Sequence, residues 1–126
     1  MAVREPERKP RAEAVVAKAL VRAAQRLGLS QGELAEVLGT SAASVSRTWN
    51  GGRPIAPDSA EGRHALLFLR LFRSLDTLVG GDEEKARRWL EARNAHLGGQ
   101  APRALLASTP GLVRVAEYLD AMRGTL

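Results

Sequence analysis

Residues 30–51 read SQGELAEVLGTSAASVSRTWNG, and this stretch decides the fold. Ser30, with Glu33 three residues later, has the pattern of a capping box and predicts the start of a short helix. Apolar residues at helical spacing continue that helix over residues 30–38. Gly39 then stands where a positive φ is needed for a tight turn.

A second short helix is predicted over residues 40–49, and the Asn-Gly-Gly sequence at 50–52 ends it. The spacing of Ala35, Gly39 and Val45 suits two helices that cross at a steep angle through a tight turn. Ala35 is small enough to let the helices approach each other, and Val45 fills the angle between them. The stretch therefore predicts a helix-turn-helix.

Helical patterns continue on both sides of this motif. The cations Lys18, Arg22 and Arg26 are four residues apart and predict one solvated stripe on the preceding helix. Residues 58–79 carry apolar side chains on more than one helix face, so this helix is expected to form the centre of the core, with a subunit interface as the alternative. No β pattern of useful length occurs. The other predicted helices cover residues 11–27, 82–93, a short piece from Pro102, and 108–124.

These elements predict an all-α fold, in which a helix-turn-helix bundle is followed by a small helical C-terminal domain. Residues 1–10 are charged, interrupted by prolines and poor in apolar side chains, so we expect a flexible basic arm there. The helix-turn-helix domain with its connecting helix is assigned to residues 11–80, and the C-terminal domain to residues 81–126.

The composition favours a polyanionic partner and excludes several classes of protein. The 126 residues carry 19 Lys and Arg against 14 Asp and Glu, a net charge of +5, which favours nucleic-acid binding. The absence of cysteine excludes a disulfide framework and a thiolate metal site. No apolar run approaches the roughly 18–20 residues of a membrane span, so we expect a cytoplasmic protein that does not contact a membrane.

The stretch 30–51 resembles the helix-turn-helix of Xre/Cro-type repressors, in which the form SQxELAxxLGxSxxxVSRxxNG recurs. The resemblance implies that residues 40–49 form the recognition helix and enter the major groove of operator DNA by their N-terminal end. Arg47 is then the best candidate for reading guanine, with a phosphate contact as the alternative. The alanines at 42 and 43 limit direct readout to thymine methyl groups. The residues implied at base edges are Ala42, Ala43, Ser46 and Arg47, and those implied at phosphates are Gln31, Ser41, Ser44 and Asn50.

A second pattern occupies residues 82–126. Its elements are Trp89-Leu90, Asn94-x2-Leu97-Gly98-Gly99, Pro102-x2-Leu105-Leu106 and Thr109-x-Gly111-x3-Val115. The pattern resembles the C-terminal toxin-binding domain of the Xre/MbcA/ParS antitoxin family. Arg93 departs from it, since the family often has proline before the asparagine, and this should alter the corner only locally. Trp89 is expected to anchor the core of this half, with an exposed partner contact as the alternative.

The joint resemblance implies an antitoxin of a type II toxin–antitoxin system. Its partners would be operator DNA and a RES- or ParT-type toxin, which consumes NAD or transfers ADP-ribose from it. The antitoxin, itself no enzyme and without a cofactor, would block the toxin's active site and repress the shared operon as a homodimer. The toxin contact is placed only coarsely, on exposed residues of the C-terminal half: Arg93, Asn94, His96, Arg114, Tyr118, Arg123 and Leu126.

Two other classes of function remain as alternatives. An enzyme fits poorly, because His64 and His96, the only histidines, have no histidine or carboxylate three or four residues later to complete a metal site. Helix capping explains the acidic cluster at 82–84, and Gly98-Gly99 is too short to cradle a phosphate. The sequence does not exclude a solitary transcription regulator whose C-terminal half only dimerises.

Overall fold

The computed structural model describes residues 5–124, with side chains from Arg11 onward, and this part of the chain is all-α, as predicted. It has no strand, and an isolated bridge joins Asn94 to Gln100. No helix in this range is long and apolar enough to cross a membrane. The α-helices are α1 (Glu5–Arg26), α2 (Gln31–Leu38), α3 (Ala42–Gly51), α4 (Ala60–Leu78), α5 (Glu83–Glu91), α6 (Pro102–Leu105) and α7 (Thr109–Gly124), with a 3₁₀ helix, η1 (Ala95–Leu97), before α6.

Local capping chemistry sets the helix ends. The capping box predicted at the start of α2 is present, because Ser30 and Glu33 each accept a hydrogen bond from the other's backbone N–H. Gly39 ends α2 in the left-handed conformation with φ of 66°. The predicted range of α3, 40–49, is two residues early at both ends, since α3 spans Ala42–Gly51. The Ser41 hydroxyl accepts the N–H of Ser44 and makes Ser41 the N-cap.

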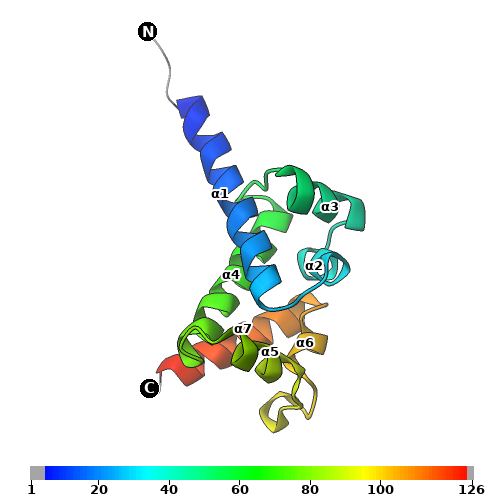
Figure 1. The fold of residues 1–126 in the computed structure, drawn as a ribbon, viewed down its shortest axis with the longest axis vertical. Coiled ribbons are helices and arrows are strands. Elements are labelled where there is room, and N and C mark those ends of the chain that lie inside the picture. Colours follow the sequence, from blue (N-terminus) through cyan, green and yellow to red (C-terminus); the bar gives the residue numbers. More distant parts are fainter. Residues whose placement is uncertain (1–4, 125–126) are drawn as a thin grey trace.

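Helix α1 begins earlier than predicted. The sequence places its start at residue 11, whereas the structure is helical from Glu5, so six residues of the expected arm belong to the helix. Pro6 does not prevent this, because it falls in the first turn, where a missing N–H costs no helical hydrogen bond. The N-terminal part of α1 projects beyond the other helices (Figure 1). Residues 1–4 lie outside the described residues.

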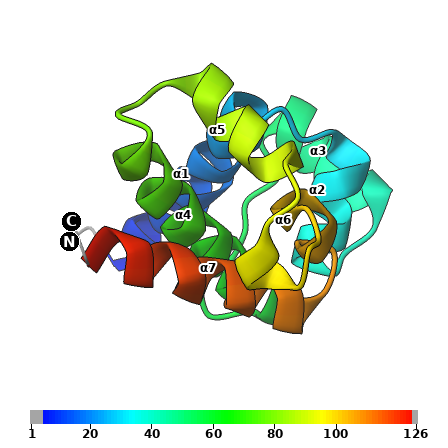
Figure 2. The same ribbon diagram turned by 90° about the horizontal axis from the view of Figure 1, so that it is seen from below.

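Helix α4 is the centre of the molecule, as its apolar sequence predicted. It packs against α1 and α2 and runs alongside α7 (Figures 1 and 2). Phe68, Leu71 and Leu75 on α4 are fully buried. The buried residues form one hydrophobic cluster that extends from Val16 to Leu119. The helix-turn-helix half (α1–α4) and the C-terminal half (α5–α7) therefore share a single core.

Gly62, in the first turn of α4, is a point where the fold tolerates no side chain. A Cβ atom there would lie 1.9 Å from the carbonyl oxygen of Ala56, and neither backbone moves easily. We expect Gly62→Ala to lower the free energy of unfolding by at least about 2 kcal/mol, measured by urea denaturation. Gly32→Ala is the matched control, since its Cβ would meet only the Ser30 hydroxyl at 3.9 Å. Equal stability of the two variants would contradict the packing described here.

Candidate functional surfaces

The exposed face of α3 carries a line of hydrogen-bonded polar side chains. The Ser41 hydroxyl donates to the Ser44 hydroxyl at 3.0 Å, and Nη2 of Arg47 donates to the same oxygen at 3.3 Å. Ser41 and Arg47 are exposed and Ser44 is half-buried. These residues, predicted separately, thus lie together along one side of the helix, with the guanidinium held above its N-terminal turn.

The other residues predicted to face DNA are placed around this line. Ala42 and Ala43 are exposed in the first turn of α3, as a base-edge contact requires. The exposed Asn50 donates to the Ser46 hydroxyl at 3.2 Å near the opposite end of the helix. Gln31 is the first residue of α2 and is half-buried. The beginnings of both helices, where unpaired backbone N–H groups favour anions, therefore carry predicted phosphate contacts.

The opposite face of α3 closes the motif. Val45 is 1% exposed and fills the angle between the helices, as predicted. Thr48 is buried and Trp49 packs partly buried against the core, so both lie on the inner face of α3. Within residues 11–124, the Thr48 hydroxyl oxygen is buried without a hydrogen-bond partner.

The predicted stripe of three cations on α1 divides into two parts. Lys18 and Arg22 are exposed and line a groove of about 440 Å³ together with Trp49 of α3. Arg26 instead pairs with Asp76 at 3.3 Å and lies over the ring of Phe72, 5.3 Å from its centroid. Helical spacing alone groups the three residues, and only tertiary packing separates them.

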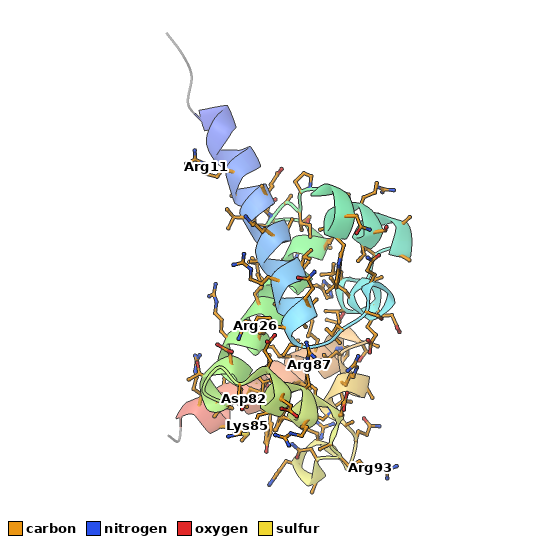
Figure 3. The ribbon with its side chains drawn as sticks, in the orientation of Figure 1. Arg11, Arg26, Asp82, Lys85, Arg87 and Arg93 are labelled. Carbon is orange, nitrogen blue, oxygen red and sulfur yellow. The ribbon has the colours of Figure 1, made fainter. Side chains whose placement is uncertain are left out.

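Two arginines of the C-terminal half hold the junction between α1 and α2. Arg87 on α5 donates to the carbonyl oxygens of Gln25 and Arg26, both at 3.0 Å, and so satisfies the end of α1. Arg87 lies close to Arg26, where the end of α1 meets α5 (Figure 3). Arg103 on α6 pairs through two nitrogens with the two carboxylate oxygens of Glu33, each at 2.7 Å. It also donates to the carbonyl oxygen of Gly28 at 2.8 Å.

Three aromatic rings form a row on the C-terminal half. The rings of Trp89 on α5 and Tyr118 on α7 are stacked, with centroids 6.3 Å apart. His96 of η1 stacks on Tyr118 as well, with ring centroids 5.8 Å apart. Trp89 and Tyr118 are half-buried and His96 is exposed. Trp89 is thus neither the fully buried anchor nor the free contact residue of the two predictions, because it packs on the core and keeps part of its ring in solvent.

The glycine corner beside this row is organised by Asn94. Its carboxamide oxygen accepts the backbone N–H of His96 at 2.9 Å, and its backbone carbonyl accepts the N–H groups of Leu97 and Gly99. Gly98 has φ of 70°, in the left-handed region. Asn94 therefore shapes the corner and sets the position of His96 in the aromatic row.

Two family models match this chain. Residues 7–70 match the antitoxin Xre-like helix-turn-helix domain, and residues 74–124 match the antitoxin Xre/MbcA/ParS C-terminal toxin-binding domain. The chain belongs to the Xre/MbcA/ParS antitoxin family. It is an antitoxin with a helix-turn-helix domain and a toxin-binding domain, as its sequence patterns implied.

One solved structure with the same fold is the crystal structure of the M. tuberculosis MbcT–MbcA toxin–antitoxin complex. The match has a TM-score of 0.64 at 23% sequence identity and covers 89% of this antitoxin and 96% of the matched chain. No curated protein matches the sequence.

The toxin-binding domain of this antitoxin holds most of the residues predicted to face a toxin. Arg93, Arg114 and Arg123 are exposed, and Arg93 points away from the body of the molecule (Figure 3). Arg114 lies beside the glycine corner, 3.9 Å from where a Cβ on Gly98 would be. Leu126 lies outside the described residues. Sequence patterns missed Arg87 and Arg103, whose partners at the junction of α1 and α2 are more than 60 residues away along the chain.

His64, near the start of α4, uses both ring nitrogens in contacts within the fold. One ring nitrogen of His64 lies 2.8 Å from the carbonyl oxygen of Ala60, and the other lies 2.8 Å from the hydroxyl of Thr109. His64 therefore links α4 to the start of α7. A similar link follows further along, where the buried Ser74 hydroxyl donates to Asp120 at 2.7 Å and Arg70 pairs with the same carboxylate. Ser74 and then Arg70 lower the pKa of Asp120.

The pairing of Glu33 makes the stability of the antitoxin sensitive to acid. The hydrogen bonds from Arg103 lower the pKa of Glu33 from 4.5 to about 2. A carboxylate with a lowered pKa stabilises the fold above its unfolded pKa, and this contribution is lost as the pH falls from about 4.5 towards 2. We expect the melting temperature of the wild-type antitoxin to fall more between pH 5 and 3 than that of Arg103→Gln. If the melting temperatures of the two proteins fell in parallel with pH, the Glu33–Arg103 pair would contribute nothing to stability.

Proposed function

We propose that this antitoxin neutralises a RES- or ParT-type toxin, one that consumes NAD or transfers ADP-ribose from it, by binding the toxin directly. The observation that carries this proposal is the match of residues 74–124 to a toxin-binding domain, on which the aromatic row is partly exposed. The fold shared with a chain of the MbcT–MbcA complex supports it. The antitoxin would act in the cytoplasm, without a cofactor and without catalysis of its own.

The toxin contact is proposed to centre on the row of Trp89, Tyr118 and His96, with Arg93 and Arg114 beside the glycine corner. Aromatic and arginine side chains supply much of the binding energy at protein interfaces. Asn94 would act indirectly, because its side chain is engaged in holding the corner. Arg123 and Leu126 extend the proposed contact towards the C-terminus.

We further propose that the antitoxin represses its own operon by binding operator DNA as a homodimer, through α3 of each copy. The surface that supports this proposal is the exposed face of α3, with Arg47 for a base edge and the serine hydroxyls for phosphates. A single module of this size contacts too little DNA for tight specific binding, so two half-sites about one helical turn apart are expected. Affinity should fall steeply with salt, since counterions are released on binding.

Co-expression with the product of the adjacent reading frame tests the toxin part of the proposal. We expect that frame to arrest growth when it is induced alone and the antitoxin to restore growth while co-purifying with its product. A transcriptional reporter driven by the upstream DNA tests the other part, with repression expected. Repression without any effect on a neighbouring toxin would favour the solitary regulator whose C-terminal half only dimerises.

A further inference from the structure

We infer that Arg103, a residue of the toxin-binding domain, is a positioning residue for DNA binding. It holds the start of α2 and neutralises Glu33, so the DNA affinity of the helix-turn-helix depends on the C-terminal half. This inference rests on the proposed binding of DNA by α2 and α3.

The contacts of one guanidinium connect three helices at this point. Arg103 reaches Glu33 in the first turn of α2, the carbonyl oxygen of Gly28 just after α1, and Glu91 of α5 at 3.3 Å. The paired, two-nitrogen geometry fixes both direction and distance, unlike the single charge of a lysine. The buried Pro102 begins α6 and keeps the following arginine in place. Arg103 therefore fixes where α2 starts relative to α1.

Leu27 and Leu29, on either side of Gly28, are buried in the core and also hold this junction, but the side that faces α6 is more open. A groove of about 470 Å³ lies between α2 and α6, lined by Leu29, Val37 and Ala104 as well as by the charged pair. Where apolar side chains do not close the space, a polar clamp carries more of the connection. Arg87 is the second part of that clamp, and Gly28 accommodates it, because a Cβ there would lie 3.2 Å from Nε of Arg87.

The charge of Glu33 matters because of where it lies. Gln31, a proposed phosphate contact, is the first residue of α2, and Glu33 is two residues further along the same turn. A carboxylate so close to DNA lies within one Debye length of the phosphates and repels them when it is unpaired. The Glu33 carboxylate also accepts the backbone N–H of Ser30 and so caps the start of α2. Because Arg103 pairs with Glu33, the capping carboxylate puts no net negative charge on the surface proposed to face DNA.

Binding of a fluorescent duplex from the DNA upstream of the antitoxin gene, compared with a scrambled duplex, tests this inference. The full-length variants are Arg103→Gln, Glu33→Gln and the double variant, with melting curves for each. Arg88→Gln is the matched control, because it removes one exposed positive charge from the same half. We expect Arg103→Gln to bind the upstream duplex roughly five- to tenfold more weakly than Arg88→Gln.

The double variant separates charge from folding. It leaves no unpaired carboxylate at the start of α2, so its DNA affinity should return to within about twofold of Glu33→Gln. If Arg103→Gln does not fold, the comparison of the double variant with Glu33→Gln still tests whether Arg103 acts through Glu33. Equal affinities of Arg103→Gln and Arg88→Gln, or a double variant well below Glu33→Gln, would overturn the inference. A wild-type protein that does not distinguish the two duplexes would instead overturn the proposed repression, and the inference with it.

Discussion

Replacing Arg47 with glutamate is expected to abolish operator repression while toxin neutralisation is retained. If the guanidinium reads guanine, its loss in Arg47→Ala alone costs roughly 1–3 kcal/mol of operator binding, and a carboxylate in the groove adds repulsion from the phosphates. Arg47 is exposed on α3, so folding should change little. The measurement is paired: an operator-reporter signal and growth rescue against the toxin, for the same variant.

Arg73→Glu is the control for this change, because it reverses an exposed charge near the C-terminal end of α4. It should repress normally. Loss of growth rescue in a folded Arg47→Glu variant would show that the helix-turn-helix half itself contacts the toxin, against the division of labour proposed here. An equal loss of operator and random DNA binding in Arg47→Ala would assign Arg47 to phosphate.

The second large effect is expected from Trp89→Ala, which should weaken toxin binding at least about 30-fold, the loss typical of an interface hot spot. The indole is half-buried and forms one end of the aromatic row, so its truncation removes contact area and leaves Tyr118 without its stacking partner on that side. Because Trp89 is not fully buried, the loss of stability should stay below the roughly 3–5 kcal/mol of a buried tryptophan. Surface plasmon resonance on immobilised toxin, with a melting curve, measures both.

Trp49→Ala is the matched variant, because Trp49 is also half-buried but lies on α3 in the other half. It should lose stability and keep its toxin affinity. Trp89→Phe, which retains a ring in the row, should recover most of the toxin binding. Unchanged toxin affinity in a folded Trp89→Ala would remove the aromatic row from the proposed contact.

The features that could be predicted from sequence are those set by neighbouring residues. Ser30 and Glu33 cap a helix through groups three residues apart, and Gly39 takes a φ that other residues avoid. The core position of α4 followed from apolar residues on more than one face. The family could be named because both patterns occur in the family's order, and both models match.

The features that could not be predicted depend on distant parts of the chain. Arg103 and Glu33 are 70 residues apart, and periodicity assigns both to exposed helix positions without indicating that they meet. The aromatic row needs α5, η1 and α7 to be placed before its rings come together. Asn94 stays a predicted toxin contact, and the sequence did not indicate that its side-chain oxygen also accepts a hydrogen bond from His96. Such distinctions between contact and support need the tertiary structure.

The activity of the purified toxin on NAD, measured as antitoxin is added, tests most directly whether this chain blocks a toxin by binding it. We expect NAD loss, or ADP-ribose transfer, to fall to zero at a fixed ratio of antitoxin to toxin. Trp89→Ala should require a higher concentration for the same inhibition, and Arg47→Glu should not. A toxin that stays fully active in the presence of excess wild-type antitoxin would contradict neutralisation by direct binding.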